Sequence, residues 1–78
     1  MNEMINRIGD RMVVKARVVN LAVEEGDYAH NIRECPTYSE FYGMIELLKT
    51  MGIEYDIEFN REVTHMTAIV IMGKRFEV

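Results

Sequence analysis

Residues 53–72 read IEYDIEFNREVTHMTAIVIM, and this stretch decides the fold class. Its first seven residues alternate between apolar and acidic side chains, which is the period-two pattern of a strand with one buried face. A second, β-branched run follows over 64–72 after a polar loop centred on 60–62, so the two runs predict an antiparallel hairpin. A two-residue turn at Gly73 and Lys74 then leads into a short last strand over 75–78, which completes a three-stranded meander.

The register of this hairpin follows from its apolar pattern, because a slip of one residue exchanges the two faces of a strand. Pairing Phe59 with Thr64 gives one apolar face, formed by Ile53, Tyr55, Ile57, Phe59, Met66, Ala68 and Val70. The same pairing places Glu58 opposite His65. It also gathers a second apolar patch on the other face, formed by Ile69, Ile71, Phe76 and Val78. Monomers rarely leave such a patch in water, so we expect the N-terminal helix or another subunit to cover it.

Residues 38–51 predict a helix, because apolar side chains recur there at helical spacing and Gly52 follows in the position that ends many helices. We expect this helix to cover the sheet face that bears Ile53, Tyr55, Ile57 and Phe59. Both segments have the cleanest amphipathic patterns of the chain.

The N-terminal third of the chain allows two interpretations. Residues 2–25 place apolar side chains on one stripe at 100° per residue, which favours a helix. Residues 13–19 are rich in valine, and Gly9 and Asp10 could form a turn, which favours a strand over 12–23. The predicted fold is α+β, with an N-terminal helix and a second helix packed on the C-terminal antiparallel meander. The alternative with a strand over 12–23 is β-α-β-β.

The size of the chain predicts a single domain, 1–78, that needs extra burial. Cys35 is the only cysteine, so no disulfide can form within the chain. Oligomerisation is the remaining source of stability, and we expect a homodimer. The candidate interface comprises Ile8, Met12, Ile69, Ile71, Phe76 and Val78. An unpaired thiol, the lack of a roughly 20-residue apolar run and an N-terminus unlike a signal peptide favour a cytoplasmic protein without a membrane span.

The charge distribution argues against binding to nucleic acid. The net charge is −4, and residues 24–60 carry nine acidic against two basic side chains. A phosphate backbone requires clustered lysine and arginine instead. The row Glu54, Asp56 and Glu58, with His65 near its end, is a candidate acidic docking face for another protein. Carboxylates at period two on a flat strand do not wrap a cation, so no metal site is predicted there.

No catalytic or cofactor motif is present in the sequence. His30 and Cys35 are close in sequence, but a nucleophilic pair also needs a group that orients the base, so we expect Cys35 to be neither catalytic nor metal-binding. The sequence therefore favours a small interaction module without a cofactor, acting as a homo-oligomer or as an adaptor or inhibitor that docks on another protein. The alternative is a small enzyme, or a subunit of one, that uses His65 with Glu58, or Cys35.

Overall fold

The computed structural model describes residues 2–25 and 36–78, and these form two helices and a three-stranded antiparallel sheet. Helix α1 spans Asn2–Glu24 and helix α3 spans Pro36–Thr50. The strands are β1 (Tyr55–Phe59), β2 (Met66–Ile71) and β3 (Lys74–Glu77), in the spatial order β1-β2-β3. The predicted α+β fold, with two helices and a C-terminal meander, is therefore confirmed. Residues 12–23 are helical, so the β-α-β-β alternative is wrong.

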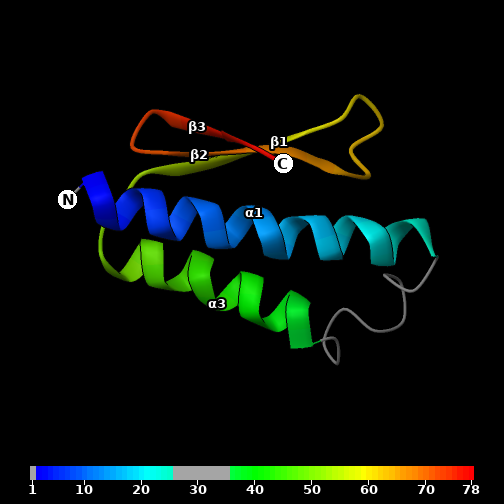
Figure 1. Ribbon diagram of the computed structural model, residues 1–78, viewed down its shortest axis with the longest axis horizontal. Helices are drawn as coiled ribbons and strands as arrows, with labels where there is room; N and C mark the ends of the chain where they lie inside the picture. Colours follow the sequence, from blue (N-terminus) through cyan, green and yellow to red (C-terminus); the bar gives the residue numbers. More distant parts are fainter. Residues whose placement is uncertain (1, 26–35) are drawn as a thin grey trace.

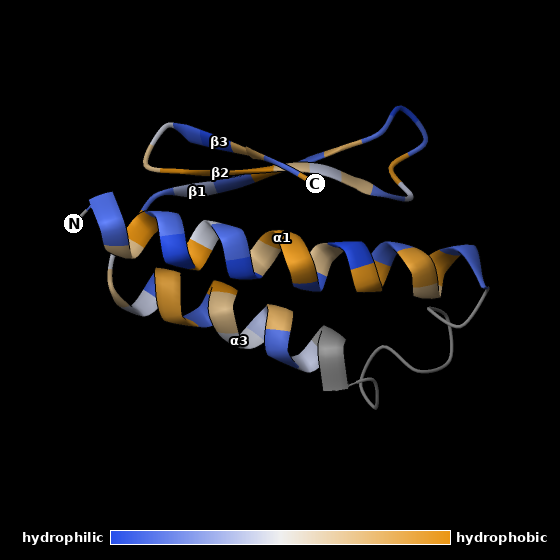
Figure 2. Ribbon diagram, viewed as in Figure 1, coloured by the Kyte–Doolittle hydropathy of each residue, from blue (hydrophilic) through white to orange (hydrophobic). Residues whose placement is uncertain are grey.

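Helix α1 covers the sheet, and α3 packs chiefly against α1. Figure 1 shows α1 lying between the sheet and α3, with the C-terminal turns of α1 extending past α3. Both helices pack on the sheet as predicted, but α1 rather than the second helix makes most of the contacts with it. The apolar stripe of α1 is the longer of the two, with Ile5, Gly9, Met12, Val13, Ala16 and Val19 buried. It lies against β2, which Figure 2 shows as the most hydrophobic strand of the sheet.

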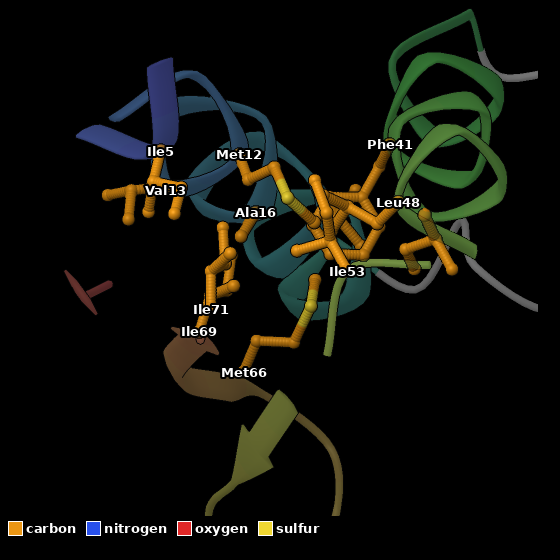
Figure 3. Packing of buried hydrophobic residues seen from close by; sticks show 12 residues of the cluster. Ile5, Met12, Val13, Ala16, Phe41, Leu48, Ile53, Met66, Ile69 and Ile71 are labelled. Atoms are coloured by element: carbon orange, nitrogen blue, oxygen red, sulfur yellow. The ribbon is translucent and has the colours of Figure 1, made fainter. Parts of the chain in front are cut away.

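The core lies where the two helices meet the sheet. Met12 from α1, Leu48 from α3 and Ile69 and Ile71 from β2 are fully buried. Figure 3 shows Phe41 and Leu48 of α3 pointing into the same cluster as Met12 and Met66. Residues of α3 thus reach the core across the flank of α1 rather than from directly above the sheet.

The register of the β1–β2 hairpin differs from the predicted one. Tyr55 lies opposite Ile71, and Ile57 lies opposite Ile69, so the two strands place these four side chains on one face. Sequence alternation cannot choose between the registers, because residues of both parities in β2 are apolar. The loop fixes the register. The Asn60 side-chain oxygen accepts hydrogen bonds from the backbone amides of Thr64 (2.8 Å) and His65 (3.1 Å). These amides are therefore held in the loop.

A register shift between Glu58 and Phe59 brings Met66 back to the core face. Glu58 lies opposite Ala68, whereas Phe59 lies opposite Met66, so Thr67 has no paired residue in the register of β1, and its hydroxyl donates a hydrogen bond to the Glu58 carbonyl at 3.2 Å. An extra residue in one strand turns the following side chain to the other face. This shift explains why Met66, Ile69 and Ile71, which differ in parity, all belong to one buried cluster.

The second turn lies one residue earlier than predicted. Met72 and Gly73 both have positive φ, 52° and 81°, and Ile71 pairs with Lys74. Positive φ at both central residues defines the type I′ turn, which matches the twist of a two-residue hairpin. A turn at Gly73 and Lys74 would pair Ile71 with Phe76 and Ile69 with Val78, but that prediction is wrong, and Phe76 lies opposite Ile69.

Two contacts lock α1 onto the sheet. The Asn20 side chain accepts a hydrogen bond from the Met66 amide and donates one to the Met66 carbonyl, each 2.9 Å long. Met66 of β2 lies beyond the last residue of β2 that pairs with β3. Asn20 therefore makes the hydrogen bonds to the Met66 backbone that a longer β3 would otherwise make. At the other end, Gly9 lies directly under the Phe76 ring: an added Cβ would come within 2.4 Å of it.

Candidate interaction groove

Half of the sheet residues of the predicted interface are buried within this chain. Ile69 and Ile71 are fully buried under α1, as is Met12 of the helix itself. Phe76, Val78 and Ile8 are partly buried and pack against the core. Of the two covers expected for the sheet patch, the N-terminal helix is the one observed. These contacts remove Met12, Ile69 and Ile71 from the candidate interface.

The predicted acidic docking face is engaged in contacts within the chain. Glu58 accepts hydrogen bonds from the Arg75 guanidinium at 3.1 and 3.2 Å, and Arg75 also pairs with Glu77. Asp56 accepts a hydrogen bond from the Ile57 amide at 2.9 Å. An occupied amide at the edge of a sheet is less able to accept another strand. Two of the three carboxylates in this row therefore serve the sheet itself.

His65 is directed to a different carboxylate from the one predicted. Its Nε2 lies 3.4 Å from Glu24 Oε1 at the end of α1, and its Nδ1 lies 2.9 Å from the Thr64 hydroxyl. The observed register places Glu58 opposite Ala68 instead of His65, so the predicted acid–base pair is not assembled. His30 and Cys35 lie outside the described residues. Within 2–25 and 36–78, no three histidine, cysteine or acidic side chains form a group that could hold a metal ion.

A groove of about 1010 Å³ runs between α1 and α3. Its apolar lining comes from both helices, with Met4 and Ile8 from α1 and Met44 and Leu47 from α3. Its charged lining is mainly basic on α1 and acidic on α3: Arg7, Asp10, Arg11, Lys15 and Glu40. The spacing of Arg7, Arg11 and Lys15 at four-residue intervals places them on one side of α1. Lys15 and Glu40 form an ion pair that links the two helices.

Apolar side chains are also exposed on the side of α1 that faces away from the core. Val14, Val18 and Leu21 recur at helical spacing and are 58%, 43% and 56% exposed. Leu47 on α3 and Met51 just after it are exposed by about half, and Met4 of α1 is 38% exposed. A surface helix normally carries polar residues opposite its buried stripe. The outer surface of α1 and α3, which together form the helical layer, therefore carries more apolar side chains than a helix face that contacts only water.

Gly43 lies in the interior of α3, and no contact within the described chain requires a glycine there. It lines the groove, and an added Cβ would meet nothing within 4 Å. A glycine in a helix interior costs about 1 kcal/mol relative to alanine. Unlike Gly9, which the Phe76 ring requires, Gly43 weakens its helix while leaving open space at the groove.

A second, smaller cavity of about 400 Å³ lies between the two helices and the β1–β2 hairpin. Its lining is mostly apolar and includes Phe41, Ile45, Ile57, Phe59 and Met66. This cavity continues the core cluster towards β1, whereas the larger groove opens on the outer side of the helices. The two differ in chemistry, because only the larger groove has a row of cations along one side.

Ile8 is a groove residue that the sequence predicted for an interface, whereas Met44 and Leu47 belong to the apolar helical pattern over 38–51, and no pattern singled out Gly43 or Arg11. The available signals were a glycine within a strong helical pattern and valines outside the stripe of α1. No family model, curated protein or solved structure matches the chain. In the part of the chain that is described, neither helix is long and apolar enough to cross a membrane.

Proposed function

We propose that this chain is a non-enzymatic protein-interaction module whose docking surface is the groove between α1 and α3. The observation that carries the proposal is the exposed apolar surface of the helical layer beside a row of three cations. Apolar anchors with a charged rim are the general composition of protein interfaces. Methionines supply adaptable contacts, and Met4 and Met44 both line this groove.

The form of the module is a homo-oligomer or an adaptor that docks on another protein. An enzymatic role with His65 and Glu58 has less support, because His65 is directed to Glu24 and Glu58 to Arg75. A lone cysteine, which cannot form a disulfide within the chain, supports a reducing compartment such as the cytoplasm for this role.

The experiment that tests the proposal is site-specific photo-crosslinking in the native cells. A photoreactive residue is placed at Leu47 in the groove or at Met72 in the β2–β3 turn, two positions with matched exposures of 51% and 54%. The proposal predicts a discrete protein adduct from position 47 and none from position 72. The absence of any adduct from position 47, or equal adducts from both positions, would contradict it.

A further inference from the structure

We infer that the occupant of this groove is a second copy of the chain, seated so that α1 of each copy lies over α3 of the other. The inference rests on the proposed function and adds the identity and orientation of the partner. It starts from the size of the chain: 78 residues with one cysteine form a small core, and self-association is a common source of additional burial.

The area of the helical layer is of the order that a dimer requires. The helices have 23 and 15 residues, which at about 1.5 Å per residue gives lengths of about 35 and 22 Å. Side by side they offer a face of several hundred Å², and a standard interface takes about 800 Å² from each subunit. That amount is about a seventh of the 5441 Å² that this chain exposes.

The charges of the groove select one orientation of the two-fold axis. An axis across the helices would stack α1 on α1 and bring Arg7, Arg11 and Lys15 against their own copies. An axis along the helices places α1 over α3 of the second copy, where Glu40 is the carboxylate that lines the groove. Opposite charges then face each other at both symmetry-related contacts, and the assembly closes without forming a polymer.

The positions of the residues along the helix axes place Arg11 over Gly43 of the second copy. The Lys15–Glu40 ion pair sets the relative level of α1 and α3. The two helices run antiparallel (Figure 1). Arg11 lies four residues before Lys15, and Gly43 lies three residues after Glu40, so both are about one helical turn from that pair in the same direction. An axis along the helices preserves this level, so Gly43 leaves room where the opposing α1 crosses.

Arg11 is available for this contact. Among the described residues, Arg7 is within 3.5 Å of Glu3 and Lys15 pairs with Glu40, whereas no ion pair is found for Arg11. Its position one turn from Glu40 lets its guanidinium reach the carboxylate of the second copy. Glu40 is half exposed, so its carboxylate remains accessible beside Lys15.

The test is complementation between two charge-reversed variants, Arg11→Glu and Glu40→Arg. Each variant alone places like charges together at both contacts of its homodimer, so its dissociation constant should rise about tenfold or more. An equimolar mixture restores an opposite-charge pair at both contacts, because the Glu at 11 of one chain meets the Arg at 40 of the other. Sedimentation velocity from nanomolar to high micromolar concentration measures all three samples and the wild type, and circular dichroism checks that each variant is folded.

The inference predicts a wild-type dimer, weakened homodimers and a restored heterodimer. A wild type that is monomeric at every concentration, or a mixture no tighter than its components, would overturn it. The photo-crosslinking experiment separates this failure from that of the proposed function. An adduct from position 47 whose mass differs from that of two chains would keep the interaction module and exclude the second copy, whereas no adduct would contradict the module itself.

Discussion

The two described helix-interior glycines, Gly9 of α1 and Gly43 of α3, have opposite surroundings. Gly9 is buried against the Phe76 ring, and any Cβ there would collide with it. Gly43 is exposed at the groove, and a Cβ there would touch nothing. The same residue type thus closes the contact between helix and sheet at one site and leaves open space at the other. The difference indicates that the side of the helices at Gly9 is packed against the sheet of the same chain, whereas the side at Gly43 is left open at the groove.

The largest loss of stability is expected at Leu48, which packs in the core of the chain. Leu48 is fully buried, whereas its neighbour Leu47 is about half exposed in the groove. Leu48→Ala should lower the free energy of unfolding by about 2–5 kcal/mol, the range for a buried leucine. Leu47→Ala is the matched control and should change the stability of the monomer by less than about 0.5 kcal/mol. Urea denaturation at low protein concentration measures both, and equal losses would contradict the placement of these two side chains.

Asn20 should give the next largest loss. Asn20→Ala leaves the Met66 amide and carbonyl without their partners in a partly buried site. The expected cost is about 1–3 kcal/mol in the free energy of unfolding. Amide hydrogen exchange at Met66 provides a local readout and should accelerate in the variant. Unchanged exchange at Met66 would show that the hydrogen bonds to Asn20 are not what protects this end of β2.

Gly9→Ala should destabilise the protein even though alanine favours a helix. The new methyl group must displace the Phe76 ring, and overpacking of this kind costs about 1–3 kcal/mol. Removal of the ring relieves the conflict, so Gly9→Ala should be neutral or stabilising in a Phe76→Ala background. Thermal denaturation of the four proteins of this double-mutant cycle measures the coupling. Additive effects of the two changes would argue against a direct contact between the helix and β3 at this point.

Gly43→Ala should have the smallest effect, and with the opposite sign. Nothing surrounds the added methyl group within the chain, so the gain in helix propensity should raise the stability of the monomer by about 0.5–1 kcal/mol. Chemical denaturation at a concentration below that of association measures this gain. A loss of stability would show that Gly43 has a role inside the chain and would remove the contrast with Gly9.

The fold class was predictable because two segments have unambiguous periodicity. The alternation over 53–59 and the helical spacing over 38–51 are both found in the elements of the structure. The helical assignment of α1 also followed from its apolar stripe, which outweighs the local valine preference for strands because the stripe lies buried against β2 and α3.

The register and the site were not predictable in the same way. β2 is apolar on both of its faces, so its pairing depends on Asn60, whose side chain holds the Thr64 and His65 amides in the loop. The N-terminal helix was one of the two covers expected for the sheet, but its close approach at Gly9 was not predictable, because the sequence presents Gly9 as a turn signal. Ile8 of the groove was among the predicted interface residues, whereas Met44 and Leu47 were not, since they continue the apolar stripe of the helical pattern and only the packing of α3 beside α1 leaves them at the groove.

The association of the wild-type chain and of Gly43→Ala is best compared by sedimentation velocity across a dilution series. We expect the wild type to form dimers at micromolar concentration. We expect the variant to dissociate at higher concentration than the wild type although its monomer is more stable, because the methyl group occupies the space that the second copy's α1 requires. A wild-type chain that remains monomeric at every concentration, or a variant that associates as tightly as the wild type, would contradict the proposed dimer.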